Sequence, residues 1–171
     1  MKNRDTDCSW YPNPDNRVDE PFEPSAAFSL QDSIVDRFDA IARRHASRLA
    51  VQDTESSLTY GELKALVDRI AAATTAATQG RAGPVAILLA ADAGLPAAML
   101  GVLAAGRAYV ALDPDFPGER NGSIVAEANA CAVVSSENLL KAARAFFPRD
   151  IRVIDISDLR ATEARLAARS R

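Results

Sequence analysis

The stretch "AGRAYVALDPDFPGER", residues 105–120, decides the fold class of this 171-residue chain. Gly106 suits the position just after the end of a helix. The apolar segment 108–112 that follows predicts a short strand, and a turn containing Pro114 and Pro117 then leads into another helix. Helix, strand, turn and helix in close succession are typical of α/β proteins, so we expect this stretch to border a sheet.

The same alternation of apolar segments and helical patterns continues on both sides. A continuous apolar segment at 84–90 predicts a strand buried on both faces, as in a parallel sheet, and 131–135 and 151–155 predict further strands. Helices are expected at 93–105, 117–129 and 137–145. We therefore predict an α/β fold in three layers, with a mostly parallel sheet flanked by helices.

Before this region, the spacing of apolar residues predicts a helix over 29–45. Ser29 and Asp32 form its expected N-terminal cap. Its apolar face is expected to hold Leu30, Ile34, Phe38 and Ile41.

Two short strands and a second helix are expected next. The strands, at 49–53 and 56–60, are separated by a polar turn. The second strand runs directly into the helix, with Thr59 as its N-cap and Glu62 three residues later. The predicted buried stripe of this helix consists of Leu63, Leu66, Val67, Ile70 and Ala71.

The chain is expected to have one domain with a tail at each end. Residues 1–28 hold four of the nine prolines and a surplus of acidic charge, which predicts an extended or partly disordered arm. Its aromatic residues are costly to leave in water, so parts of the arm are expected to lie on the domain or on a partner; they are Trp10, Tyr11, Phe22 and Phe28. The α/β domain is predicted over 29–156, and a short Arg-rich helix or tail over 157–171.

Composition excludes several classes of function. Beyond residue 24 the acidic and basic residues balance, and no basic stripe exists to follow phosphates, so we expect no nucleic-acid partner. Cys8 and Cys131 give no metal-ligand spacing and are expected to be free thiols. The chain has neither the apolar region of a signal peptide nor an apolar run long enough to span a bilayer. We therefore expect a cytoplasmic protein that does not associate with membranes.

Motifs for nucleotide or metal chemistry are not found in the sequence. Gly101 and Gly106 have the spacing of a phosphate-binding loop, but Arg107 and Ala108 stand where lysine and serine or threonine are needed, and both glycines fall at a helix end. His45, the single histidine, follows Arg43 and Arg44 and is interpreted as a helix-end cation. We expect no metal or cofactor to be held by this chain.

Asp113 and Asp115 follow a predicted strand, where α/β folds tend to place ligands. They could form a carboxylate pair for acid–base work or for a metal, but a structural role is favoured. Asp113 is held extended by the following Pro114, and Asp115 is expected to accept backbone N–H groups of the turn. Glu119 and Arg120 are expected to form a surface pair. Gly94 and Gly101 are expected to allow close packing of a helix on the sheet.

Two motifs resemble those of amino-acid adenylation domains of nonribosomal peptide synthetases, within the AMP-forming adenylate ligases. They are "LTYGEL" at 58–63 and "LAAGRAYVALDPDFPGER" at 103–120, in the family's order and spacing. The resemblance extends over about 30–155. The residues that match the family's structural motifs are Thr59, Tyr60, Glu62, Gly106, Tyr109, Asp113, Pro114, Pro117 and Arg120. Ala111 replaces a usual proline, and Asn121 and Gly122 depart from the pattern and are expected to weaken the following helix.

The resemblance implies a fold and an activity for a complete domain. Such a domain forms an aminoacyl-AMP from an amino acid and ATP and passes the acid to a carrier thiol. The matched motifs are structural; the family's phosphate loop, later ATP-binding motifs and catalytic lysine have no counterpart in this sequence. No catalytic, cofactor-binding or metal-binding residue is carried over, and ATP and magnesium are implied only for a complete domain.

Three hypotheses for function follow. The first is a truncated or split N-terminal adenylation segment, inactive alone, that meets a second chain or itself through an incomplete sheet edge or helix face. The alternative is a non-catalytic module that docks to a synthetase, a carrier or an MbtH-like protein, with Phe116, Pro117 and Gly118 as the candidate interaction surface. The third is an independent nucleotide-binding α/β domain, which would need a phosphate cradle that the sequence does not show.

Overall fold

The computed structural model of this protein describes residues 32–157 and Leu159. The predicted N-terminal arm at 1–28 lies outside the described residues. Of the predicted tail at 157–171, only Ser157 and Leu159 are described. The helices are α1 (Ile34–Arg44), α2 (Tyr60–Thr78), α3 (Gly94–Ala104), α4 (Gly118–Glu127) and α5 (Glu137–Ala143), the last followed by a 3-10 turn (Arg144–Phe146). The strands are β1 (Leu49–Gln52), β2 (Ser57–Thr59), β3 (Val85–Leu88), β4 (Tyr109–Leu112), β5 (Ala132–Ser135) and β6 (Arg152–Asp155).

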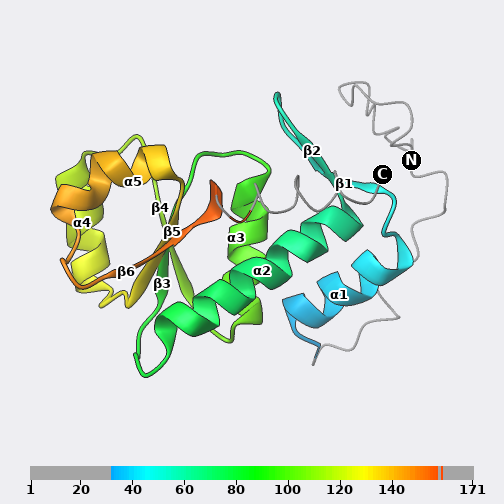
Figure 1. The fold of residues 1–171 in the computed structure, drawn as a ribbon, viewed down its shortest axis with the longest axis horizontal. Helices are drawn as coiled ribbons and strands as arrows, with labels where there is room; N and C mark the ends of the chain where they lie inside the picture. The colour runs from blue at the N-terminus through cyan, green and yellow to red at the C-terminus, as the bar shows by residue number, and fades with distance from the viewer. Residues whose placement is uncertain (1–31, 158, 160–171) are drawn as a thin grey trace, which may run out of the picture.

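The centre of the fold is a four-stranded parallel sheet in the order β4-β3-β5-β6. The chain moves from β3 outward to β4 and then crosses back over β3 to β5. Because parallel crossovers are right-handed, this reversal sends α3 to one face of the sheet and α4 and α5 to the other. Figure 1 shows these layers, with α1 and α2 on the side of α3. The predicted three-layer α/β fold with a mostly parallel sheet is confirmed.

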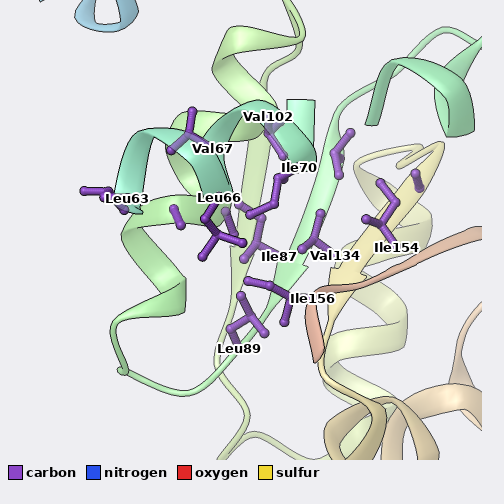
Figure 2. Packing of buried hydrophobic residues seen from close by; sticks show 14 of the residues in the cluster. Leu63, Leu66, Val67, Ile70, Ile87, Leu89, Val102, Val134, Ile154 and Ile156 are labelled. Carbon is purple, nitrogen blue, oxygen red and sulfur yellow. The ribbon is translucent and has the colours of Figure 1, made fainter. Parts of the chain in front are cut away.

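The core lies on both sides of β3, whose four residues are all buried. Val85 and Ile87 point toward α2 and α3, while Ala86 and Leu88 belong to a second cluster formed with α4 and α5. This alternation follows from the period of two residues along a strand. Figure 2 shows the first cluster, where Ile87 lies among side chains of α2, α3 and β5. Each large side chain that is buried here contributes about 1.5–3 kcal/mol.

Four of the five residues in the predicted stripe of α2 are buried, Leu63, Leu66, Val67 and Ile70, whereas Ala71 is half-buried. Thr59 caps this helix, and Glu62 closes the capping box by accepting the backbone N–H of Thr59 at 2.8 Å. No helix among the described residues is both long and apolar enough to cross a bilayer.

Gly101 is where α3 approaches α2. A Cβ at this position would lie 2.6 Å from Cγ2 of Ile70 and 3.1 Å from the carbonyl oxygen of Val67. The predicted close contact at Gly101 therefore exists, but it joins two helices and not a helix and the sheet. The sequence shows that a small residue stands at Gly101, but it does not show which element packs against it. That element is α2, because α2 and α3 lie on the same face of the sheet.

The first helix begins later than the sequence pattern predicted. α1 starts at Ile34, and Ser33 with Asp36 forms its capping box, so the expected cap by Ser29 and Asp32 is wrong. The Ser-x-x-Asp pattern four residues further on, Ser33 and Asp36, makes both hydrogen bonds of the capping box. Ile34, expected in the buried face, is 65% exposed. Leu30 lies outside the described residues.

The antiparallel hairpin of β1 and β2 is fastened to α3 by Asp53 in its turn. One carboxylate oxygen of Asp53 accepts the backbone N–H groups of Glu55 and Ser56, at 2.8 and 2.7 Å. The other accepts the N–H of Ala93, at 2.8 Å, at the start of α3. These backbone hydrogen bonds, that of Ala93 foremost, lower the pKa of Asp53 to about 2.

Replacing Gly101 with alanine is expected to destabilise the protein by about 1–3 kcal/mol, because the added methyl group overpacks the α2–α3 contact. In an open helical position the same change would stabilise by about 1 kcal/mol. Urea unfolding at equilibrium measures the difference, with Ala72→Gly on the exposed side of α2 as a control that reports helix propensity alone. A Gly101→Ala protein as stable as the parent would contradict the packing described.

Replacing Asp53 with asparagine is expected to lower the melting temperature at pH 7. In acid, the difference in melting temperature between the variant and the parent is expected to become smaller. The folded pKa of about 2 lies below the ordinary 3.8, so the stabilisation by Asp53 is present above pH 3.8 and is lost as the pH falls toward 2. Melting temperatures measured between pH 7 and pH 2 test this, with Glu55→Gln in the same turn as the charge control. A difference that does not change with pH would refute the role of the carboxylate.

Candidate functional site

The carboxyl ends of β3, β4, β5 and β6 meet at one edge of the sheet, which is where α/β proteins bind their ligands. Aspartates lie at or just after three of these ends: Asp92 follows β3, Asp113 follows β4, and Asp155 ends β6. Asp113 belongs to the stretch that the sequence singled out. We call this edge, from Leu89 to Gly94 and from Asp113 to Arg120 together with Ser135 and Asp155–Ser157, the carboxyl edge.

Each of these aspartates makes the same local hydrogen bond. Its carboxylate accepts the backbone N–H two residues later: Gly94 for Asp92 at 2.7 Å, Asp115 for Asp113 at 2.9 Å, and Ser157 for Asp155 at 2.8 Å. Such turns are a recurring use of aspartate, which competes well for nearby backbone donors. The chain thus uses these carboxylates to form its own turns.

The start of α3 is also occupied by side chains of this chain. Helix N-termini carry unpaired N–H groups and attract anions. In this protein the N–H of Ala93 donates to Asp53 and that of Gly94 donates to Asp92, at 2.8 and 2.7 Å. Two carboxylates therefore stand where a phosphate would bind in a nucleotide-binding fold.

At the end of β5, the Ser135 hydroxyl is fully buried and donates to the carbonyl oxygen of Leu88 at 2.9 Å. This bond joins the ends of β5 and β3, the two strands whose following helices lie on opposite faces of the sheet. That place between neighbouring strands is the usual ligand crevice of such sheets.

The turn after β4 is held by Asp113 and Asn121. The Asp113 carbonyl oxygen accepts the N–H of Phe116 at 3.1 Å and the Nδ2 group of Asn121 at 2.8 Å. Because it is the Asp113 carboxylate that accepts the N–H of Asp115, the expectation that Asp115 accepts the turn's N–H groups is wrong. Pro117 precedes the helix as its N-cap residue, with a φ of −51°, and α4 begins at Gly118.

Arg120 lies over the ring of Phe116, with its guanidinium carbon 4.0 Å from the ring centroid. Within the described residues, Arg120 thus contacts an aromatic face and does not form the expected pair with Glu119. Of the three residues in the candidate interaction surface, Phe116 and Gly118 are half-buried and Pro117 is exposed. Whether this surface binds a partner stays a prediction.

Gly118 and Gly122 form a notch on α4 that receives Phe146. A Cβ at Gly118 would lie 2.3 Å from the ring of Phe146, and one at Gly122 would lie 2.4 Å from its carbonyl oxygen. The two glycines are four residues apart and therefore share one face of the helix. Asn121 and Gly122, expected only to weaken the helix, position the turn and admit Phe146.

Of the other residues of the matched motifs, Pro114 lies at the carboxyl edge, whereas Gly106 and Tyr109 lie at the opposite end of β4. Gly106 ends α3 with a φ of +70°, a conformation that favours glycine, and Tyr109 begins β4. Thr59, Tyr60 and Glu62 lie in the hairpin and the first turn of α2. Pro114 is half-buried within the turn.

His45 is the C-cap residue of α1, and its backbone N–H donates to the carbonyl oxygen of Ile41 at 2.9 Å. Cys131 is buried as a free thiol, 3.4 Å from the carbonyl oxygen of Gly83; Cys8 lies outside the described residues. Within 32–157 and Leu159, no group of three or more His, Cys, Asp or Glu side chains is arranged to hold a metal ion.

Comparison with known proteins gives a consistent family. The sequence pattern of the AMP-binding enzyme family matches residues 38–170. The AMB antimetabolite synthetase AmbB of Pseudomonas aeruginosa is 41% identical over 101 residues, which cover 57% of this chain and 8% of that protein. Surfactin synthase subunit 1 of Bacillus subtilis is 35% identical over 102 residues, which cover 60% of this chain and 3% of that protein.

Comparison with solved structures points to the same class of proteins. The nonribosomal peptide synthetase FmoA3, in a form with bound α-methyl-L-serine-AMP, superposes with a TM-score of 0.65 at 29% identity and covers 72% of this chain and 14% of that one. The N-terminal subdomain of NpsA from Klebsiella oxytoca shares the fold, with a TM-score of 0.63 at 22% identity, over 74% of this chain and 32% of that one.

The chain thus spans less than a tenth of the length of these two curated relatives. The family pattern nevertheless covers most of this chain, and its fold is that of adenylation domains. The protein therefore belongs to the AMP-binding enzyme family, in which it corresponds to an N-terminal segment of a nonribosomal peptide synthetase adenylation domain.

Proposed function

We propose that this chain is the N-terminal scaffold of an amino-acid-activating adenylation domain and that it does not form an adenylate alone. A complete domain would join an amino acid to AMP at the expense of ATP. The similarity to peptide synthetases supports this proposal, as does the α-methyl-L-serine-AMP held by the similar FmoA3 structure. ATP and magnesium would bind only to the complete domain.

The observation that carries this proposal is that carboxylates of this chain occupy backbone N–H groups in three turns of the carboxyl edge and at the start of α3. The turns after β3, β4 and β6 each use an aspartate to bind their own backbone N–H, and Asp53 covers the start of α3. A phosphate group that bound there would have to displace a carboxylate from a hydrogen bond of 2.7–2.9 Å. The edge is therefore suited to hold the sheet and its helices in place.

The positions of the lysines support the same conclusion. Phosphate binding in nucleotide sites draws on a cation near the transferred group. Lys64 lies in α2, where Asp68 is 2.6 Å away and Asp39 3.6 Å away. Lys141 lies in α5 and pairs with Glu137 at 2.7 Å. Neither of these lysines lies in a loop of the carboxyl edge.

The remaining parts of the domain would come from further residues of a longer chain or from a second chain. β4 and β6 are the outer strands of the described sheet, and outer strands offer unpaired backbone groups for extension. We propose that the catalytic remainder meets the scaffold at such an edge or on an adjoining helix face. Because the reaction consumes ATP, the proposed place of action is the cytoplasm.

Pyrophosphate exchange dependent on amino acid measures adenylate formation directly. The isolated chain is expected to give no exchange with any amino acid, and exchange is expected when a chain carrying the later motifs of the same domain is added. Gly101→Val, which disrupts the α2–α3 contact, is the matched control and should abolish the gain. Exchange by the isolated chain would contradict the proposed dependence on a remainder. No exchange with the remainder present would contradict the proposed activity.

A further inference from the structure

An apolar groove lies between the start of α1 and the end of α3. Its volume is about 410 Å³, and it is lined by Ser33–Asp36 on one side and by Leu103, Ala104 and Gly106 on the other. Ile34 is 65% exposed, the highest value among the exposed large hydrophobic residues of the described part of the chain. An aliphatic side chain beside an apolar groove is typical of a surface that another apolar group covers.

The position of the groove indicates which segment can reach it. Residues 1–31 join the described chain directly before Ser33, which is itself part of the groove lining. The groove lies at the end of α3, next to the start of β4, whereas the described chain finishes beyond the opposite end of β6. The segment before α1 is therefore adjacent to the groove.

The sequence immediately before α1 supplies suitable side chains. Phe28 is five residues before Ser33, a separation that an extended chain spans in at most about 18 Å, and Leu30 is closer. A cavity of about 150 Å³ is enough to admit a benzene ring. A groove of about 410 Å³ therefore has room for a phenylalanine ring and a leucine side chain together.

We propose that the groove between α1 and α3 is the docking site of the chain's own residues 28–30, with Phe28 and Leu30 covering Ile34. This contact removes apolar surface from water on both partners. It also fastens α1 to the end of α3 and explains why Ile34 stands out from the buried face of its helix. The proposal is independent of the adenylation function, because it concerns only how this chain packs on itself.

A single-tryptophan protein tests the docking. Trp10, the only tryptophan, is replaced by phenylalanine, and Phe28 is replaced by tryptophan. The tryptophan emission of this Trp10→Phe, Phe28→Trp chain is expected to be shifted to the blue, and adding Ala104→Lys in the groove is expected to move it to the red. Ala72→Lys, on the exposed side of α2, is the matched control and should leave it unchanged. Emission typical of water without the groove substitution, or emission insensitive to Ala104→Lys, would overturn the proposal.

Two further measurements separate this docking from other occupants of the groove. A blue shift that grows with protein concentration would show that a second copy fills the groove, and it would overturn the proposal. In a double-mutant cycle, Phe28→Ala and Ile34→Ala are expected to lower the melting temperature by less together than the sum of their separate effects. Phe22→Ala with Ile34→Ala should be additive. Full additivity for Phe28 and Ile34 would also contradict the proposed contact.

Discussion

The burial of β3 on both faces and both edges is the constraint on which the rest of the structure depends. This strand pairs with β4 and β5 in parallel, and its side chains alternate between the two clusters of the core. Both faces of β3 are covered because α3 lies on one face of the sheet and α4 and α5 lie on the other (Figure 1). The position of Gly101 follows, because α2 and α3 must share one face and approach closely over β3 and β5.

The polar groups at the carboxyl edge follow from the same arrangement. Parallel strands end together and leave backbone N–H groups in the turns, and in three of the four turns, those after β3, β4 and β6, an aspartate accepts one of them. Asp53 extends the pattern by tying the β1–β2 hairpin to α3. An edge that in many α/β proteins is open to a ligand is here used for structure, which fits the place of this segment at the N-terminal side of an adenylation domain.

Much of this could be predicted from the sequence, and the exceptions have physical causes. The segments 84–90 and 131–135 place two strands correctly, the first of them buried as predicted, and Thr59 and Glu62 cap α2 as expected. The start of α1 was misplaced because two capping patterns stand four residues apart, and local sequence does not show at which of them the helix begins. The partners of Gly101, Gly118 and Gly122 depend on contacts between distant segments. Asp113, and not Asp115, accepts the backbone N–H group of the turn, and this choice depends on turn geometry. The position of Asp113 directly after an apolar strand was the sequence feature that could have indicated it.

At the carboxyl edge, the turns after β3, β4 and β6 are held by the chain's own aspartates, and we propose that this edge binds no nucleotide without the rest of the domain. Amide NMR spectra recorded during a titration with magnesium and ATP test it most directly. The account predicts that the amide signals of Gly94, Asp115 and Ser157 keep their positions, because each N–H already donates to an aspartate. Saturable shifts of these three signals would contradict it.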